Sequence, residues 1–398
     1  MKTRASLCLV LFVIFAAAAG NSGKAQNPAG GTAKQPSSEP AKPAAKAPAL
    51  ELTLPVAVVD KHGALVTNLT AKDFTLTDDG HPQTIKSLAT QSPLPFWLGL
   101  VVDTGRAMNS ALDSERKAAG KFVDQMLPAD AKAGSQGNQI FLIHFDRQVE
   151  LLTDDFVAAP GKLHHELDEM STSANARGDQ GPENRDDRQG GGPGGPPRNG
   201  RLGGASQQLY DAIWLAAGEI RQQAKGERRA LIVFSDGVDS GSKETLNDAI
   251  DEADRAGAQI FTIYLKGEEE RMQNGGPGGG RQGGMGGNWP GNGGGWPGGG
   301  GNSGGKGRGD SKGAQVDGKK IMQQIATRTG GQFFEAKKKD NLEEIYGLIA
   351  NELHQQYLLV YSPDQIDPNG EYHKIALKTD KKDMTVITRE GYYASSEK

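Results

Sequence analysis

The chain has 398 residues and a formal net charge of -4, so it has no general attraction to nucleic acid or to an anionic membrane surface. Its length accommodates one core of ordinary domain size and a smaller companion. Because 36% of the residues are hydrophobic and 56 are glycine, we expect well-folded segments that alternate with unstructured ones. We expect no nucleic-acid partner.

Basic residues at the N-terminus precede a short apolar run. Lys2 and Arg4 are followed by a nearly continuous apolar stretch over residues 7–19, which is the pattern of a secretory signal peptide. The stretch is shorter than the roughly 20 residues that a membrane-spanning helix needs. We predict a signal peptide over residues 1–20 and a disordered tether, rich in Pro, Ala, Lys and Ser, over residues 21–49. The only cysteine, Cys8, falls in the signal peptide, so the mature chain is expected to form no disulfide.

These features predict a secreted or periplasmic protein with no transmembrane segment after signal removal.

Residues 50–93 then change to a β pattern, in which Leu52, Leu54 and Val56 alternate with other residues and Asp78-Asp79-Gly80 predicts a hairpin turn. Residues 357–394 again contain short strand-like runs. A few short strands cannot bury a face alone, so we expect the two ends of the chain to pair into one small β domain.

Residues 94–356 alternate between apolar runs and helical patterns. This alternation predicts an α/β domain with a doubly wound, mostly parallel sheet that helices cover on both faces. In such sheets ligands bind at the carboxyl ends of the strands, where Asp103 and Asp236 are expected. The predicted strands are 96–102, 140–145, 230–234, 260–265 and 332–334, and the predicted helices are 111–127, 163–170, 209–223, 243–256, 319–329 and 342–356.

Two tracts dominated by Gly, Pro, Asn and Arg interrupt this domain at residues 173–204 and 267–315. Composition of this kind predicts disordered insertions. Each falls where a loop is expected, and lengthening a loop costs only about 0.6 kcal/mol per doubling. Trp289 and Trp296 lie in the second tract, where tryptophan either contacts a partner or reflects composition alone.

Several blocks, taken in order, resemble a bacterial secreted family of VWFA-related domains, the acidobacterial type of von Willebrand factor A-like domain. The similarity covers about residues 50–394 apart from the two glycine-rich tracts. It implies a von Willebrand factor A-like fold over residues 94–356. The matching blocks are VVDKHGALVTNLTAKDFTLTDDGHPQTI from Val58, LGLVVDTGRAM from Leu98, LYDAI from Leu209, RRALIVFSDGVDSGS from Arg228, YLLVYSP from Tyr357 and TREGYYA from Thr388.

The resemblance also implies a divalent-cation site, in which the first strand of the domain ends in the motif DxSxS. Asp103 matches the first aspartate of that motif, and Asp236 matches the last aspartate of the site. Gly105 and Ala107 stand where the family has serine. Magnesium prefers six hard oxygen ligands, and these two side chains offer none. Replacing both by serine is expected to restore binding.

A threonine completes the site in the family. An ungapped match places Gln207 at its position, and Ser206 is one residue away. The candidate metal ligands are therefore Asp103, Ser206 and Asp236, which would hold Mg²⁺ weakly or not at all, so no cofactor is expected beyond a weakly bound Mg²⁺. Thr104, Arg106 and Gln207 are candidates for the ligand-binding face, and Arg106 is placed to neutralise Asp103 without a metal.

No pattern of catalytic residues is evident. His164-His165-Glu166 is not part of an HExxH motif because position 169 is Glu, and no GxSxG nucleophile elbow is present. His144, near a strand end, is interpreted as structural. We therefore expect no enzymatic activity. The preferred function is an exported protein–protein interaction module with a degenerate metal site, and the alternative is a metal-dependent adhesion domain that binds a protein ligand through a divalent cation.

Overall fold

The computed structural model describes residues 51–90, 94–127, 137–153, 155–170, 207–224, 226, 228–267, 317–337, 341–364 and 370–394. The predicted signal peptide and tether lie outside the described residues, as do the glycine-rich tracts except for Gly267. Residues from Ala49 to Lys398 form one compact unit. Within the described part of the chain, no helix has the length and apolar character needed to cross a membrane.

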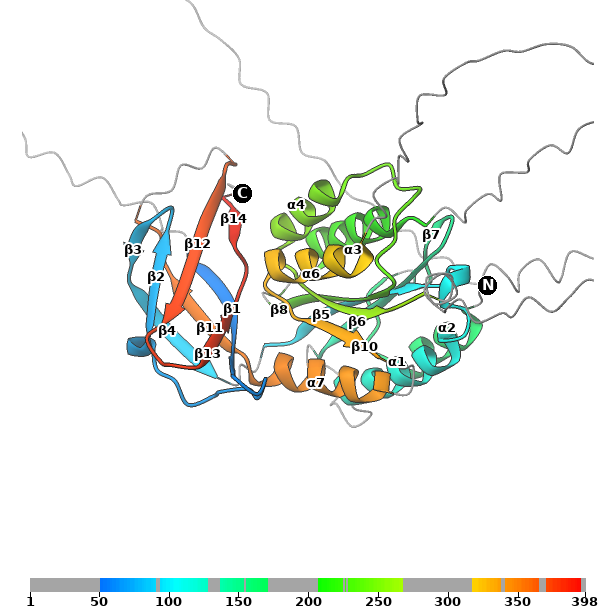
Figure 1. Cartoon of the computed structure of the whole chain (residues 1–398), viewed down its shortest axis with the longest axis horizontal. Helices are drawn as coiled ribbons and strands as arrows, with labels where there is room; N and C mark the ends of the chain where they lie inside the picture. The colour runs from blue at the N-terminus through cyan, green and yellow to red at the C-terminus, as the bar shows by residue number, and fades with distance from the viewer. Residues whose placement is uncertain are drawn as a thin grey trace, which may run out of the picture. The chain divides into compact units, whose positions relative to one another are not determined.

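A six-stranded sheet in the order β10-β9-β8-β5-β6-β7 lies between two layers of helices (Figure 1). Every residue of β5 is buried, and β5 pairs in parallel with β6 on one side and β8 on the other. Only β7 runs antiparallel, against β6. The strands are β5 (Phe96–Asp103), β6 (Gln139–Phe145), β7 (Val149–Leu151), β8 (Arg228–Ser235), β9 (Gln259–Leu265) and β10 (Phe333–Ala336).

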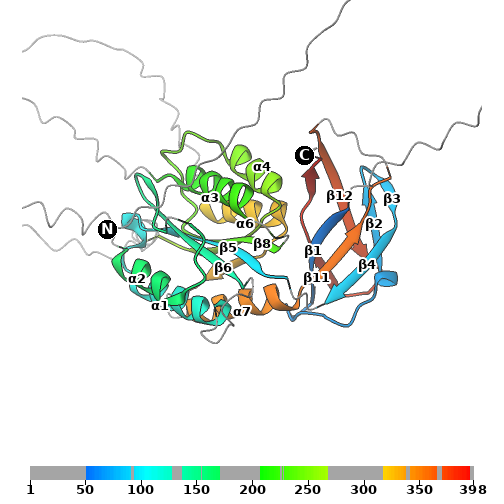
Figure 2. The same ribbon diagram turned by 180° about the vertical axis from the view of Figure 1, so that it is seen from behind.

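Helices cover both faces of this sheet, with α1, α2 and α7 on one face and α3, α4 and α6 on the other (Figures 1 and 2). Side chains of β5 alternate between the two layers: Leu98 and Leu100 join the first apolar cluster, and Val101 joins the second. The predicted α/β fold is therefore confirmed. The helices are α1 (Leu112–Met126), α2 (Pro160–Glu169), α3 (Leu209–Gln223), α4 (Leu246–Ala256), α6 (Gly318–Thr329) and α7 (Leu342–Gln355).

The remaining strands come from the two ends of the described chain and form two four-stranded sheets, β13-β1-β11-β4 and β14-β12-β2-β3. Antiparallel pairing joins β1 and β4 to β11, and β2 to β12. One apolar cluster contains side chains of both sheets. That these sheets fold as a domain of their own stays a prediction. The strands are β1 (Leu52–Asp60), β2 (Phe74–Asp78), β3 (His81–Gln83), β4 (Ile85–Thr90), β11 (Tyr357–Tyr361), β12 (Tyr372–Thr379), β13 (Met384–Ile387) and β14 (Gly391–Tyr393).

Candidate functional site at the strand ends

Two aspartates lie where the parallel strands β5 and β8 end. Asp103 is the last residue of β5, and Asp236 directly follows β8. Because β5 and β8 are parallel neighbours, their carboxyl ends meet at the same edge of the sheet. Asp103 is fully buried, with 0% of its surface exposed, and Asp236 is also buried. The structure thus brings together the two aspartates that the sequence singled out.

Three uncharged donors contact the Asp103 carboxylate. The Gly105 N–H donates to Oδ1 at 2.8 Å, the Ser235 hydroxyl donates to Oδ2 at 2.8 Å, and the Gln207 amide donates to Oδ2 at 3.2 Å. Burial, followed by the nearby charge of Asp236, raises the pKa of Asp103 to about 7, although these hydrogen bonds act in the opposite direction. Asp103 is therefore harder to ionise than an aspartate in water.

Glycines bring other parts of the chain close to these carboxylates. A Cβ atom on Gly105 would lie 2.8 Å from Asp103 Oδ1 and 2.9 Å from Gln207 Nε2. A Cβ atom on Gly267 would lie 2.6 Å from Asp236 Oδ2 and 3.1 Å from the Ala107 Cβ. The Gln207 side chain thus fills space beside Asp103, and the backbone at Gly267 comes close to Asp236.

These residues do not fit a magnesium ion. Magnesium prefers a near-octahedral set of six oxygens, whereas Gly105 and Ala107 carry no side-chain oxygen, and the amide nitrogen of Gln207 is the group turned toward Asp103. Among the described residues, a group of three His, Cys, Asp or Glu side chains suitably placed for a metal is found elsewhere in the chain, not at the strand ends. Ser206, the third predicted ligand, lies outside the described residues.

The structure also describes Thr104 and Arg106, the two other candidate residues beside Asp103. Thr104 is only 1% exposed, and its hydroxyl donates to the Phe145 carbonyl oxygen at 3.2 Å, so its place on a binding face stays a prediction. Arg106 is exposed, and within the described residues it is not among the groups that hydrogen bond to Asp103. Uncharged donors, rather than the guanidinium, surround that carboxylate.

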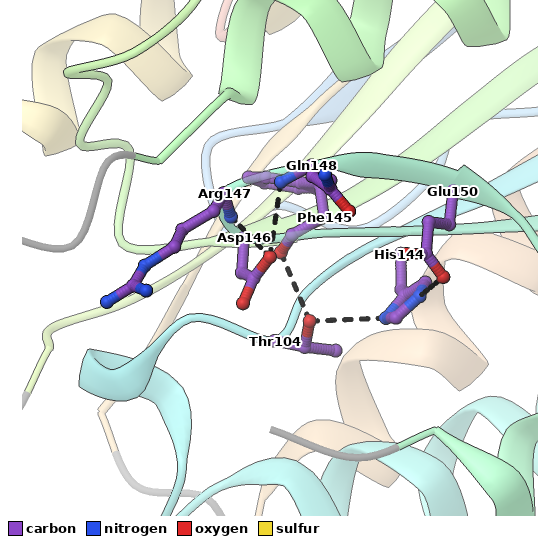
Figure 3. Close-up of polar contacts among 7 residues, drawn as sticks. All are labelled: Thr104, His144, Phe145, Asp146, Arg147, Gln148 and Glu150. Atoms are coloured by element: carbon purple, nitrogen blue, oxygen red, sulfur yellow. Dashed lines mark hydrogen bonds and ion pairs between the residues drawn. The ribbon is translucent and has the colours of Figure 1, made fainter. Parts of the chain in front are cut away.

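Thr104 belongs to a chain of polar contacts that joins β5, β6 and β7 (Figure 3). Its hydroxyl oxygen lies 3.3 Å from His144 Nδ1, and His144 Nε2 lies 3.1 Å from a Glu150 carboxylate oxygen. The order hydroxyl, imidazole, carboxylate is that of hydrolase triads. Here the hydroxyl is buried and donates to a backbone carbonyl, and the contacts link neighbouring strands.

A shallow hollow of about 650 Å³ lies beside these residues, between β7 and α3. The Gln208 N–H donates to the Asp146 carbonyl oxygen at 3.1 Å, which connects the start of α3 to the turn after β6. Arg147 in that turn is exposed and extends away from the neighbouring polar groups (Figure 3). Trp214, in the wall of the hollow, is 41% exposed. The sequence interpretation missed Trp214, although its position off the buried apolar stripe of α3 is a usable signal.

No family model matches the sequence, and no curated protein matches it. Three solved structures with similar architecture illustrate what the chain resembles. A von Willebrand factor type A protein from Catenulispora acidiphila is 8% identical with a TM-score of 0.40, over 88% of this chain and 75% of that chain. The vWF domain of the type V pili tip protein Mfa5 from Porphyromonas gingivalis is 12% identical with a TM-score of 0.39, over 66% of this chain and 95% of that chain.

The third structure is proximal thread matrix protein 1 from the mussel byssus, described with a zinc-occupied MIDAS motif. It is 11% identical with a TM-score of 0.39, over 67% of this chain, and this chain spans half of its length. The strand order described above establishes the α/β fold without these likenesses. They are too distant to assign a family or a ligand to this chain.

Proposed function

We propose that this chain is an exported protein–protein interaction module that binds its partner without a bridging cation. The strand-end face, defined here as Arg106, Arg147, Gln148, Trp214 and Lys243, is the surface that we assign to the partner. The observation that carries the proposal is the Asp103 carboxylate, whose two oxygens already accept hydrogen bonds from Gly105, Ser235 and Gln207.

The composition of the strand-end face supports a protein partner. Trp214 exposes a large apolar surface in a hollow whose rim carries the side chains of Arg147 and Lys243. Tryptophan and arginine are the residue types most enriched among the side chains that dominate binding energy. An apolar centre with a polar rim is also the usual anatomy of a protein interface. Trp214 is therefore the expected anchor, with Arg106 as a second candidate.

The metal site is proposed to be degenerate, because Gly105 and Ala107 supply no oxygen ligand and Gln207 contacts Asp103 in place of a cation. Binding is proposed rather than catalysis, since the hydroxyl of the Thr104–His144–Glu150 contact chain is buried and donates to a carbonyl oxygen. The exported location rests on the signal peptide predicted over residues 1–20. None of these three inferences depends on which protein the partner is.

The test uses the full mature chain to capture partners from exported proteins of its own organism, followed by affinity measurements on the purified pair. Trp214→Ala is expected to weaken binding at least tenfold, or about 1.4 kcal/mol, because truncation removes the apolar area that this exposed side chain would bury against the partner. Leu348→Ala is the matched control, since Leu348 is also an exposed apolar residue on a helix but lies on the opposite face of the sheet.

Chelation separates the two functions. EDTA is expected to leave the affinity unchanged within a few fold, because no metal bridges the partners. Loss of binding on chelation, restored by magnesium, would establish metal-dependent adhesion instead. Equal affinities for the unmodified chain, Trp214→Ala and Arg106→Ala would place the interface away from the strand-end face.

A further inference from the structure

A second polar cluster lies in the sheets formed by the two ends of the chain. Asp78 and Asp79 stand at the end of β2 and in the turn to β3, and His373 lies on β12. One potential ligand atom from each of these three side chains lies within 4.8 Å of the others. All three line a cavity of about 420 Å³, to which His81 and Asp364 also contribute.

The imidazole of His373 is held in place, but only one of its two nitrogens has a hydrogen-bond partner among the described residues. It is 8% exposed, its Nδ1 lies 2.8 Å from Asp79 Oδ2, and its ring stacks on Tyr392 at 5.2 Å between centroids. Because a carboxylate only accepts hydrogen bonds, Nδ1 carries the proton in this contact, and Nε2 is the nitrogen that offers a lone pair in the neutral ring. Nε2 is shielded from solvent and has no hydrogen-bond partner among the described residues.

A histidine that donates one N–H to a carboxylate is the usual arrangement in metal sites, where the carboxylate fixes the ring orientation and increases its basicity. The unsatisfied second nitrogen is the independent sign of a missing ligand, since buried polar atoms in folded proteins are normally paired.

Asp78 is also held in one orientation. It is 5% exposed, and its Oδ2 accepts hydrogen bonds from the hydroxyls of Tyr361 and Tyr392, each at 2.9 Å. The other oxygen, Oδ1, accepts no hydrogen bond from the residues that the structure describes. Carboxylates that bind metals are commonly oriented by hydrogen bonds to one oxygen in this way. The tyrosines come from β11 and β14, so the strands themselves preorganise the carboxylate.

We propose that Asp78 and the Nε2 atom of His373 bind a divalent transition-metal ion of the zinc type, with Asp79 orienting the His373 ring from Nδ1 and with His81 and Asp364 available at the same cavity. Imidazole nitrogen with carboxylate oxygens suits zinc, whereas magnesium and calcium prefer oxygen alone. Asp79 and His373 are 294 positions apart in the sequence. A shared ion would therefore crosslink the N-terminal and C-terminal strands. An intrachain disulfide cannot supply such a crosslink, because Cys8 is the only cysteine of the chain.

Zinc chloride titrated into the full mature chain is the direct test, with calorimetry for affinity and thermal unfolding for the coupled stabilisation. One zinc ion is expected to bind and to raise the melting temperature, since a ligand that binds only the folded state stabilises it. His373→Ala and Asp79→Asn are each expected to weaken zinc binding at least tenfold. The Asp79 side chain is about half exposed, so Asp79→Asn tests the proposal even where His373→Ala disturbs folding.

His164→Ala is the matched control, because His164 also contacts a carboxylate, Asp124, at 2.7 Å but belongs to no group of three ligands among the described residues. This variant should bind zinc like the unmodified chain. Asp103→Asn should also leave zinc binding unchanged, whereas loss of binding in that variant would move the ion to the strand ends and overturn the proposal. Zinc affinity weaker than millimolar, or unaffected by both Asp79→Asn and His373→Ala, would overturn it as well.

Discussion

Gln207 occupies the position at which the resemblance to metal-binding domains calls for a hydroxyl ligand. Its amide nitrogen donates to Asp103, and the same nitrogen would lie 2.9 Å from a Cβ atom added at Gly105. The two residues therefore depend on each other: a serine at position 105 requires the Gln207 side chain to move. The variant expected from the sequence to restore metal binding replaces only Gly105 and Ala107. The contact with Gln207 indicates that this residue must be replaced as well.

The first prediction is that Gly105→Ser, Ala107→Ser and Gln207→Thr together create magnesium binding that calorimetry detects. The three hydroxyls add oxygen ligands to Asp103 and Asp236, and threonine removes the amide that crowds position 105. The Gly105→Ser, Ala107→Ser double variant is expected to bind at least tenfold more weakly, and the unmodified chain no tighter than millimolar. Equal affinity in the double and triple variants would show that Gln207 does not obstruct the site.

At the scale of elements, close backbone contact joins the start of α6 to the loop after β8. Gly237 has a φ of +73°, a region that glycine adopts without strain, and a Cβ atom there would overlap the Gly318 backbone. A Cβ atom on Gly318, the first residue of α6, would in turn overlap the Asp236 carbonyl oxygen. The two glycines thus allow the helix to approach the loop that carries Asp236.

The second prediction is that Gly318→Ala lowers the free energy of unfolding by about 1–3 kcal/mol, the usual cost of overpacking, because helix and loop must separate. Gly347→Ala is the control: Gly347 lies inside α7 with nothing within 4 Å of an added Cβ atom, so this variant should gain roughly 0.5–1 kcal/mol. Urea unfolding of both variants measures the difference. An unchanged or increased stability of Gly318→Ala would show that α6 tolerates displacement.

Over the whole molecule, four of the buried carboxyl groups in the described α/β part of the chain have raised pKa values. Burial is the largest cause of a raised pKa for each: about 7 for Asp103 and Asp254, and about 8 for Glu115 and Glu352. Asp254 accepts no hydrogen bond at either oxygen, and one oxygen of Glu352 also lacks a partner among the described residues. The folded chain therefore holds protons that the unfolded chain releases near pH 4.

The third prediction concerns the pH dependence of stability. Between about pH 4 and pH 8 the folded state binds more protons than the unfolded state, so the stability contributed by these groups is present at low pH and is lost as pH rises through 7 to 8. The urea midpoint should therefore be lower at pH 8.5 than at pH 5.5. Glu352→Gln should reduce this difference, because an amide does not ionise.

Asp113→Asn is the control for the pH series, since the Asp113 side chain is 97% exposed and should leave the profile unchanged. A stability that rises between pH 5.5 and pH 8.5, or a profile that Glu352→Gln does not alter, would contradict the assignment of buried neutral carboxyl groups.

Local patterns in the sequence were sufficient to predict the α/β fold and to place Asp103 and Asp236 at the carboxyl ends of parallel strands. Buried strands such as β5 must be apolar along their whole length, and amphipathic helices must repeat their apolar residues every three to four positions, so both can be recognised within a single segment. Residues at the ends of parallel strands then share one edge of the sheet. The three-residue strand β7 was missed because it is too short to show a pattern.

Contacts between distant segments were decided only by the tertiary structure. The direction of the Thr104 hydroxyl depends on Phe145, and the hydrogen bonds of Asp103 depend on Gln207 and Ser235. The approach of His373 to Asp79 requires two strands from opposite ends of the chain to pair side by side. A segment's own composition determines which face it buries, but the groups that satisfy a buried polar atom come from whichever segment the packing brings within hydrogen-bond distance.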